Sequence, residues 1–99
     1  MKICNTVFFG STSDSLLVVK KLDACGMLSF VAVVTQPPKP VGRKKIITST
    51  PVETWARQKH VPVFIQPPRE SFDLIISASY GEKIPIEFIL SARYGGLNV

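Results

Sequence analysis

The chain has 99 residues, enough for one domain with a modest core, and its 45% hydrophobic and 19% charged residues are typical of a globular protein rather than a disordered one. Twelve Lys and Arg against seven Asp and Glu give a net charge of +5, which favours anionic partners such as nucleic acid, phosphates or folate-like carboxylates. Two cysteines make neither a disulfide framework nor a metal-ligand spacing, and the N-terminus is too short and polar for a signal peptide or membrane span, so we expect a cytoplasmic protein without a metal.

The chain opens with a strand-like run, "ICNTVFFG", that stops at Gly10 and is followed by "STSD", a group of residues that favours helix starts. We expect a helix over about residues 14–25, with Gly26 as a left-handed C-terminal cap. Its apolar face would consist of Val18, Leu22 and Cys25. The strand-to-helix turn lacks the later glycines of a dinucleotide motif, and no phosphate-cradling Gly-Lys pattern occurs. Dinucleotide binding and nucleotide hydrolysis are therefore not expected, whereas an anion at this helix N-terminus remains open.

The second strand, "FVAVVT", is continuously apolar and β-branched, which predicts a central parallel strand covered on both faces. A second helix is expected to start at Pro51, with Thr50 as N-cap and Glu53 completing a capping box, and to end near "KH". Its buried face would carry Val52, Trp55 and Ala56.

The rest of the chain predicts further short elements. We expect a short edge strand in "VPVFIQPP", a buried strand in "DLIISAS", a short helix in "IPIEFILSA", a turn in "RYGG" and a last strand beginning at "LNV". The order β-α-β-α-β-β-α-β predicts an α/β, Rossmann-like fold with an open, mostly parallel sheet and helices on both faces. Ligands in such folds bind beyond the carboxyl ends of the strands, where "GSTSD", the connection after the second strand, "SASYGEKIP" and Asn98 should converge.

The connection "QPPKPVGRKKIITST" carries four basic residues and no acidic one. These are Lys39, Arg43, Lys44 and Lys45. Charge alone favours a solvated connection, but about 15 residues exceed the usual two to six of such connections, and long structured loops are often functional. The concentrated charge suits a phosphate backbone, which Arg43 can contact with two parallel hydrogen bonds.

Taken together, these segments resemble the N-terminal domain of the methionyl-tRNA formyltransferase family. The similarity runs in order along essentially the whole chain, and the loop is its most specific part. The matching segments are "VFFGS", "TQPPKPVGRKKIITSTPVETWA", "VPVFIQP", "DLIISASYGEKIP" and "GGLNV".

The resemblance implies specific partners and residues. In that family the basic loop contacts the acceptor arm of the initiator tRNA, so Lys39, Arg43, Lys44 and Lys45 are its expected tRNA-binding residues. The stretch corresponding to "SASYGEKIP" holds the pterin of the formyl donor, 10-formyltetrahydrofolate, which implies a folate-binding role for Tyr80, Gly81, Glu82 and Ile84. Asn98 falls on the first position of the family's Asn-x-His motif, where its amide can stabilise a tetrahedral oxyanion.

The chain also departs from the family pattern. Its first loop reads "GSTSDS" where the family has Gly-Thr-Pro, the motif's His and a later Asp lie beyond Val99, and the C-terminal tRNA-binding domain is absent. We therefore expect residues 1–99 to be an N-terminal portion of a formyltransferase catalytic domain, inactive alone and exposing a sheet edge. His60 near a helix end is not assigned to catalysis. The alternatives are a formyltransferase for an amino sugar or another small amine, a noncatalytic RNA-binding α/β module, or a regulatory remnant.

Overall fold

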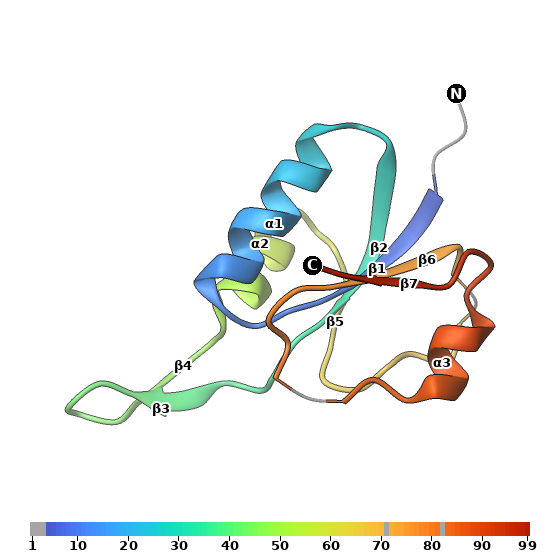
Figure 1. Cartoon of the computed structure of the whole chain (residues 1–99). Helices are drawn as coiled ribbons and strands as arrows, with labels where there is room; N and C mark the ends of the chain where they lie inside the picture. Colours follow the sequence, from blue (N-terminus) through green and yellow to red (C-terminus); the bar gives the residue numbers. More distant parts are fainter. Residues whose placement is uncertain (1–3, 71, 82) are drawn as a thin grey trace.

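A computed structural model describes residues 4–70, 72–81 and 83–99. Its centre is a five-stranded sheet in which every neighbouring pair is parallel, in the order β5-β2-β1-β6-β7 (Figure 1). The strands are β1 (Cys4–Phe9), β2 (Leu28–Val34), β5 (Val63–Phe64), β6 (Leu74–Ser77) and β7 (Gly96–Asn98). The predicted Rossmann-like α/β class is confirmed.

Helices cover both faces of the sheet. The helices α1 (Ser13–Ala24) and α2 (Pro51–Gln58) lie on one face and α3 (Ile86–Ser91) on the other (Figure 1). Each face has its own apolar core, because strand residues alternate between the two faces. On the first face Phe30 packs edge to face against Phe8 and Trp55. On the second, Phe88 packs in the same way against Phe9 and Phe72.

The helix boundaries follow the predicted caps. The side chains of Thr12 and Thr50 accept hydrogen bonds from the backbone of their own helices, and α2 begins at Pro51. Gly26 has a φ of 72°, as a left-handed C-terminal cap requires. Glu53 does not complete a box with Thr50, because its carboxylate pairs with Arg57 one turn later, at 2.9 Å.

Two expectations about burial are confirmed and one needs correction. The second strand, β2, is internal, runs parallel to both neighbours and contributes side chains to the cores on both faces, as predicted. The thiol of Cys25 is exposed instead of packed, because α1 turns Ser15 and Val19 fully inward, with Val18 and Leu22 beside them. The predicted face of α2 is confirmed, since Val52, Trp55 and Ala56 are all buried.

The basic connection after β2 is not an irregular loop. It forms an antiparallel hairpin of β3 (Lys39–Val41) and β4 (Ile46–Thr48), which projects from the body of the protein (Figure 1). Val41 pairs with Ile46, and the turn between them closes with a hydrogen bond from the backbone N–H of Lys45 to the carbonyl of Gly42, at 3.3 Å. Across the residues that the structure describes, no helix is long and apolar enough to cross a membrane.

Candidate functional site at the carboxyl edge of the sheet

Buried hydroxyl groups join the segments that leave the carboxyl ends of β1, β2 and β6. The Ser11 hydroxyl donates to the carbonyl of Tyr80 at 3.4 Å, and the Thr35 hydroxyl donates to Ser11 at 3.3 Å. Thr35 and Thr50 lie 2.6 Å apart. Because each hydroxyl has one proton, Thr50 must donate to Thr35, so the bonds run in one direction from the N-cap of α2 to the Tyr80 carbonyl. Aligned hydrogen bonds of this kind polarise and strengthen one another.

A second hydroxyl fixes the start of α1 against the end of β6. Ser15 is fully buried, and its oxygen accepts from the backbone N–H groups of Ser11 and Thr12, each at 3.2 Å. It donates to the carbonyl of Ala78. The Ser15 hydroxyl therefore bonds the turn after β1 to the segment after β6.

Gln36 connects the hairpin to the segment after β6. Its side-chain amide donates to the Tyr80 carbonyl at 3.1 Å, and its amide oxygen accepts from the Lys39 ammonium at 2.6 Å. Its backbone N–H donates to Ser11 at 3.1 Å. The Tyr80 carbonyl thus accepts from both Ser11 and Gln36.

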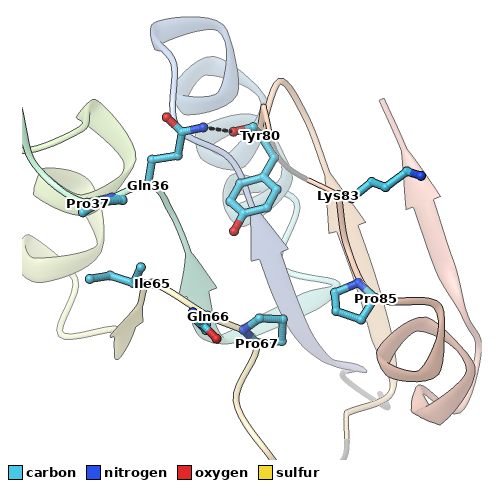
Figure 2. A pocket seen from close by; sticks show the side chains of 8 residues that line it. All are labelled: Gln36, Pro37, Ile65, Gln66, Pro67, Tyr80, Lys83 and Pro85. Carbon is cyan, nitrogen blue, oxygen red and sulfur yellow. Dashed lines mark hydrogen bonds between the residues drawn. The ribbon is translucent and has the colours of Figure 1, made fainter.

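A pocket of about 310 Å³ opens between the base of the hairpin and the 80–85 segment (Figure 2). The Tyr80 ring extends toward it between Gln36 on one side and Lys83 and Pro85 on the other. Its lining combines apolar, amide and cationic groups from three segments of the chain: Gln36, Pro37, Ile65, Gln66, Pro67, Tyr80, Lys83 and Pro85. We call this the hairpin-side pocket.

A smaller pocket of about 130 Å³ lies on the other side of the same segment, next to β7. It contains Asn98 and Ile84, two of the predicted site residues, together with Ser77 and apolar side chains. The Ser77 hydroxyl donates to Oδ1 of Asn98 at 2.9 Å, which leaves the amide N–H groups of Asn98 as the donors for a ligand. We call this the Asn98 pocket.

The four basic residues lie on the hairpin and are all exposed. Lys39 sits at its base, whereas Arg43, Lys44 and Lys45 occupy the turn at its tip. The tip carries a local positive field that is open to solvent, and the hairpin extends the longest axis of the molecule to 46 Å (Figure 1).

The structure thus divides the predicted folate residues between two pockets. Tyr80 lines the hairpin-side pocket, Ile84 lines the Asn98 pocket, and Gly81 lies against Gln36. Glu82 lies outside the described residues. His60 follows α2 and precedes β5, which places it at the amino edge of the sheet, opposite Asn98.

The segments named from the sequence meet at the carboxyl edge of the sheet, but sequence reasoning missed the individual residues that bond them together. Ser11, Ser15, Thr35 and Gln36 make the hydrogen bonds that fix this edge, and Ser77 orients Asn98. The signal was a group of polar side chains directly after two apolar strands, which is where α/β folds place their ligand sites. Their bonds between segments join residues 15 to 69 positions apart in the chain, so no local pattern identifies those bonds.

A parallel sheet with helices on both faces and pockets at its carboxyl edge defines an open α/β protein of the Rossmann-like class. Within that class, the chain is 37% identical over 105 aligned positions to the methionyl-tRNA formyltransferases of Bacillus mycoides (strain KBAB4) and Bacillus thuringiensis subsp. konkukian (strain 97-27). The alignments include 94% of this chain and 33% of each relative, so the chain spans about a third of the length of the curated relatives it matches. No protein-family model matches the chain. The resemblance to methionyl-tRNA formyltransferase is confirmed.

Proposed function

We propose that these 99 residues are part of the catalytic domain of an enzyme that transfers a formyl group from 10-formyltetrahydrofolate to the amino group of methionyl-initiator-tRNA. Such a reaction belongs to translation initiation in the cytoplasm, a reducing compartment that suits the free thiols of Cys4 and Cys25. One observation carries the proposal. This chain, which is 37% identical to proteins named methionyl-tRNA formyltransferase, has a basic hairpin and Asn98 at the same edge of its sheet.

Asn98 is the proposed catalytic residue. The amine nitrogen attacks the formyl carbon, the bond from that carbon to folate N10 breaks, the amine loses a proton and N10 gains one. Negative charge develops on the formyl oxygen in the tetrahedral intermediate, and a positioned amide N–H stabilises it. Because Ser77 holds Oδ1 of Asn98, the amide nitrogen faces away from that bond and can donate to the oxyanion. His60, at the opposite edge, takes no part.

The folate subsite is proposed around the 80–85 segment. Ile84 and its apolar neighbours supply a wall for a flat ring, while Asn98 and Ser77 supply polar groups beside it. The Asn98 pocket, at about 130 Å³, is smaller than a typical ligand pocket and suits one end of a folate rather than the whole molecule. Gly81 and Glu82 belong to the proposed subsite, whereas the Tyr80 carbonyl already accepts two hydrogen bonds.

The hairpin is the proposed tRNA contact, through Lys39, Arg43, Lys44 and Lys45. A two-stranded ribbon with a basic tip can reach a phosphate backbone without disturbing the sheet, because it buries no core residue.

Charge reversal tests the tRNA contact. The double variant Arg43→Glu/Lys44→Glu should bind an initiator-tRNA acceptor-stem duplex more weakly. The slope of log K against log salt should become shallower by about 1.8, because each phosphate that is no longer neutralised accounts for about 0.9. The matched control Lys20→Glu/Lys21→Glu makes the same charge change on α1, at exposed positions away from the hairpin. Equally weakened binding in both variants would mean that the duplex responds to net charge, and the hairpin assignment would be wrong.

Titration with a nonreactive 10-formyltetrahydrofolate analogue tests the folate subsite. The backbone amide shifts of Gly81, Ile84 and Asn98 should saturate together, while those of α2 stay unchanged. Ile84→Asp should abolish these shifts, because a carboxylate would replace the apolar wall. A folded spectrum in which the analogue shifts none of these amides would refute this subsite in the chain, and would leave the duplex result unaffected.

A further inference from the structure

Gln36 forms hydrogen bonds that reach the hairpin, the turn after β1 and the segment after β6 together. Its side chain is bonded at both ends, to Lys39 at 2.6 Å and to the Tyr80 carbonyl at 3.1 Å. Its backbone N–H is held by Ser11 at 3.1 Å. An amide is suited to this place because it has a donor and an acceptor on one rigid planar group.

The backbone after Tyr80 is shaped by the same side chain. Gly81 has a φ of 89°, a conformation that L side chains rarely adopt, and a Cβ at this position would lie 2.7 Å from Nε2 of Gln36. The amide of Gln36 therefore packs directly against the Gly81 backbone as well as bonding to the preceding carbonyl. A movement of this amide changes both the bond to the Tyr80 carbonyl and the packing against Gly81.

We propose that Gln36 is a positioning residue that couples the basic hairpin to the Tyr80–Gly81 backbone. The inference rests on the proposed function in one respect, since it links the element proposed to contact tRNA with the segment proposed to contact folate. Two arrangements are involved. In the arrangement that the structure shows, Lys39 holds the amide oxygen of Gln36 and the amide nitrogen holds Tyr80. In the second, proposed arrangement, a phosphate draws Lys39 away and the amide turns. A ligand that engages Lys39 therefore alters the 80–81 backbone.

The first test needs no ligand. Lys39→Met removes the bond to Gln36 and should shift both the Gln36 side-chain amide and the Gly81 backbone amide in spectra of the 99-residue chain. Lys44→Met, which makes the same charge change at the hairpin tip, should leave Gly81 in place. Introducing Lys39→Met into a Gln36→Leu background should produce no further shift at Gly81, because the link is already gone. Gly81 shifts that persist in that background, or that are absent in Lys39→Met alone, would overturn the proposal.

A second variant separates the two ends of the link. Gln36→Glu keeps an oxygen for Lys39 but replaces the donor to Tyr80 with a carboxylate oxygen, so it should retain the hairpin contact and lose the response of Gly81. If Gln36 had a merely structural role, Lys39→Met and Lys44→Met would give the same response at Gly81. A Gly81 response to Lys39→Met that survives in Gln36→Glu would also refute coupling through the Tyr80 bond.

The acceptor-stem duplex then tests the same link in the direction of function. In the parent chain, the duplex should shift Gly81 as well as the hairpin amides, and in Gln36→Leu it should shift the hairpin amides alone. Hairpin shifts with an unchanged Gly81 in the parent would refute the coupling. If the duplex shifts no hairpin amide, the tRNA contact fails, and the ligand-free comparison still decides whether Gln36 couples the two segments.

Discussion

At the scale of single residues, the hydroxyl of Ser15 is the polar group whose removal we expect to be most costly. It is fully buried, accepts two backbone N–H groups and donates to Ala78. Ser15→Ala leaves the buried backbone groups of Ser11 and Ala78 without this partner, and a buried polar group left unsatisfied costs about 1–3 kcal/mol. We expect the free energy of unfolding to fall by about 2 kcal/mol, measured by urea denaturation.

The control for that substitution is Ser13→Ala, two positions earlier in the same helix. Ser13 is exposed and its side chain has no role in the cap, so the change should lie within about 0.5 kcal/mol. Equal stability of the two variants would show that the Ser15 hydroxyl does not fix the turn after β1 to the end of β6.

At the scale of elements, the hairpin differs from the inner strands β1, β2 and β6 in having no covered face. All residues of β3 and β4 are exposed, and a lone two-stranded ribbon is only marginally stable in water. In contrast, Val7, Phe8 and Phe9 of β1 are fully buried between neighbouring strands. We expect hairpin amides to exchange with deuterium through local opening, orders of magnitude faster than those of β1, as measured by NMR. Protection of the hairpin equal to that of β1 would mean that an additional contact covers it.

The same contrast explains what the sequence could predict. Caps and apolar runs are local, so the starts of α1 and α2 and the parallel α/β order followed directly from residues such as Thr50 and Pro51. The hairpin was missed because its charges and prolines dominate the stretch, although the apolar pair of Val41 and Ile46 flanks a four-residue turn. Gly10 was interpreted as the end of a strand.

The structure shows that Gly10 is needed because a larger side chain would not fit at this position. A Cβ there would lie 2.6 Å from Phe8 and 2.7 Å from Ser15. That crowding, like the bonds of Gln36 and the orientation of Asn98 by Ser77, arises from segments that meet only in the folded sheet. The site therefore followed from sequence as a set of segments, whereas its internal contacts did not, because they depend on tertiary geometry.

At the scale of the whole molecule, the sheet has an open side along β7, where apolar side chains meet water. β7 pairs with β6 and, among the described strands, with no other. Leu97 on β7 is 61% exposed, and Leu90, Tyr94 and Val99 nearby in the sequence are also exposed. Unpaired backbone groups beside exposed apolar side chains favour edge-to-edge association. We expect the chain to self-associate as its concentration rises, as measured by sedimentation velocity.

A charge on that edge should oppose the association. Leu97→Lys removes an apolar side chain worth about 1.5–3 kcal/mol if fully buried and places like charges opposite each other, so the association constant should fall about tenfold or more. Leu17→Lys is the matched control, because Leu17 on α1 is 59% exposed but lies on no sheet edge. It makes the same change in charge and hydrophobicity, so an equal effect of both substitutions would assign the association to general surface properties. A parent chain that stays monomeric at every concentration would contradict the predicted association along β7.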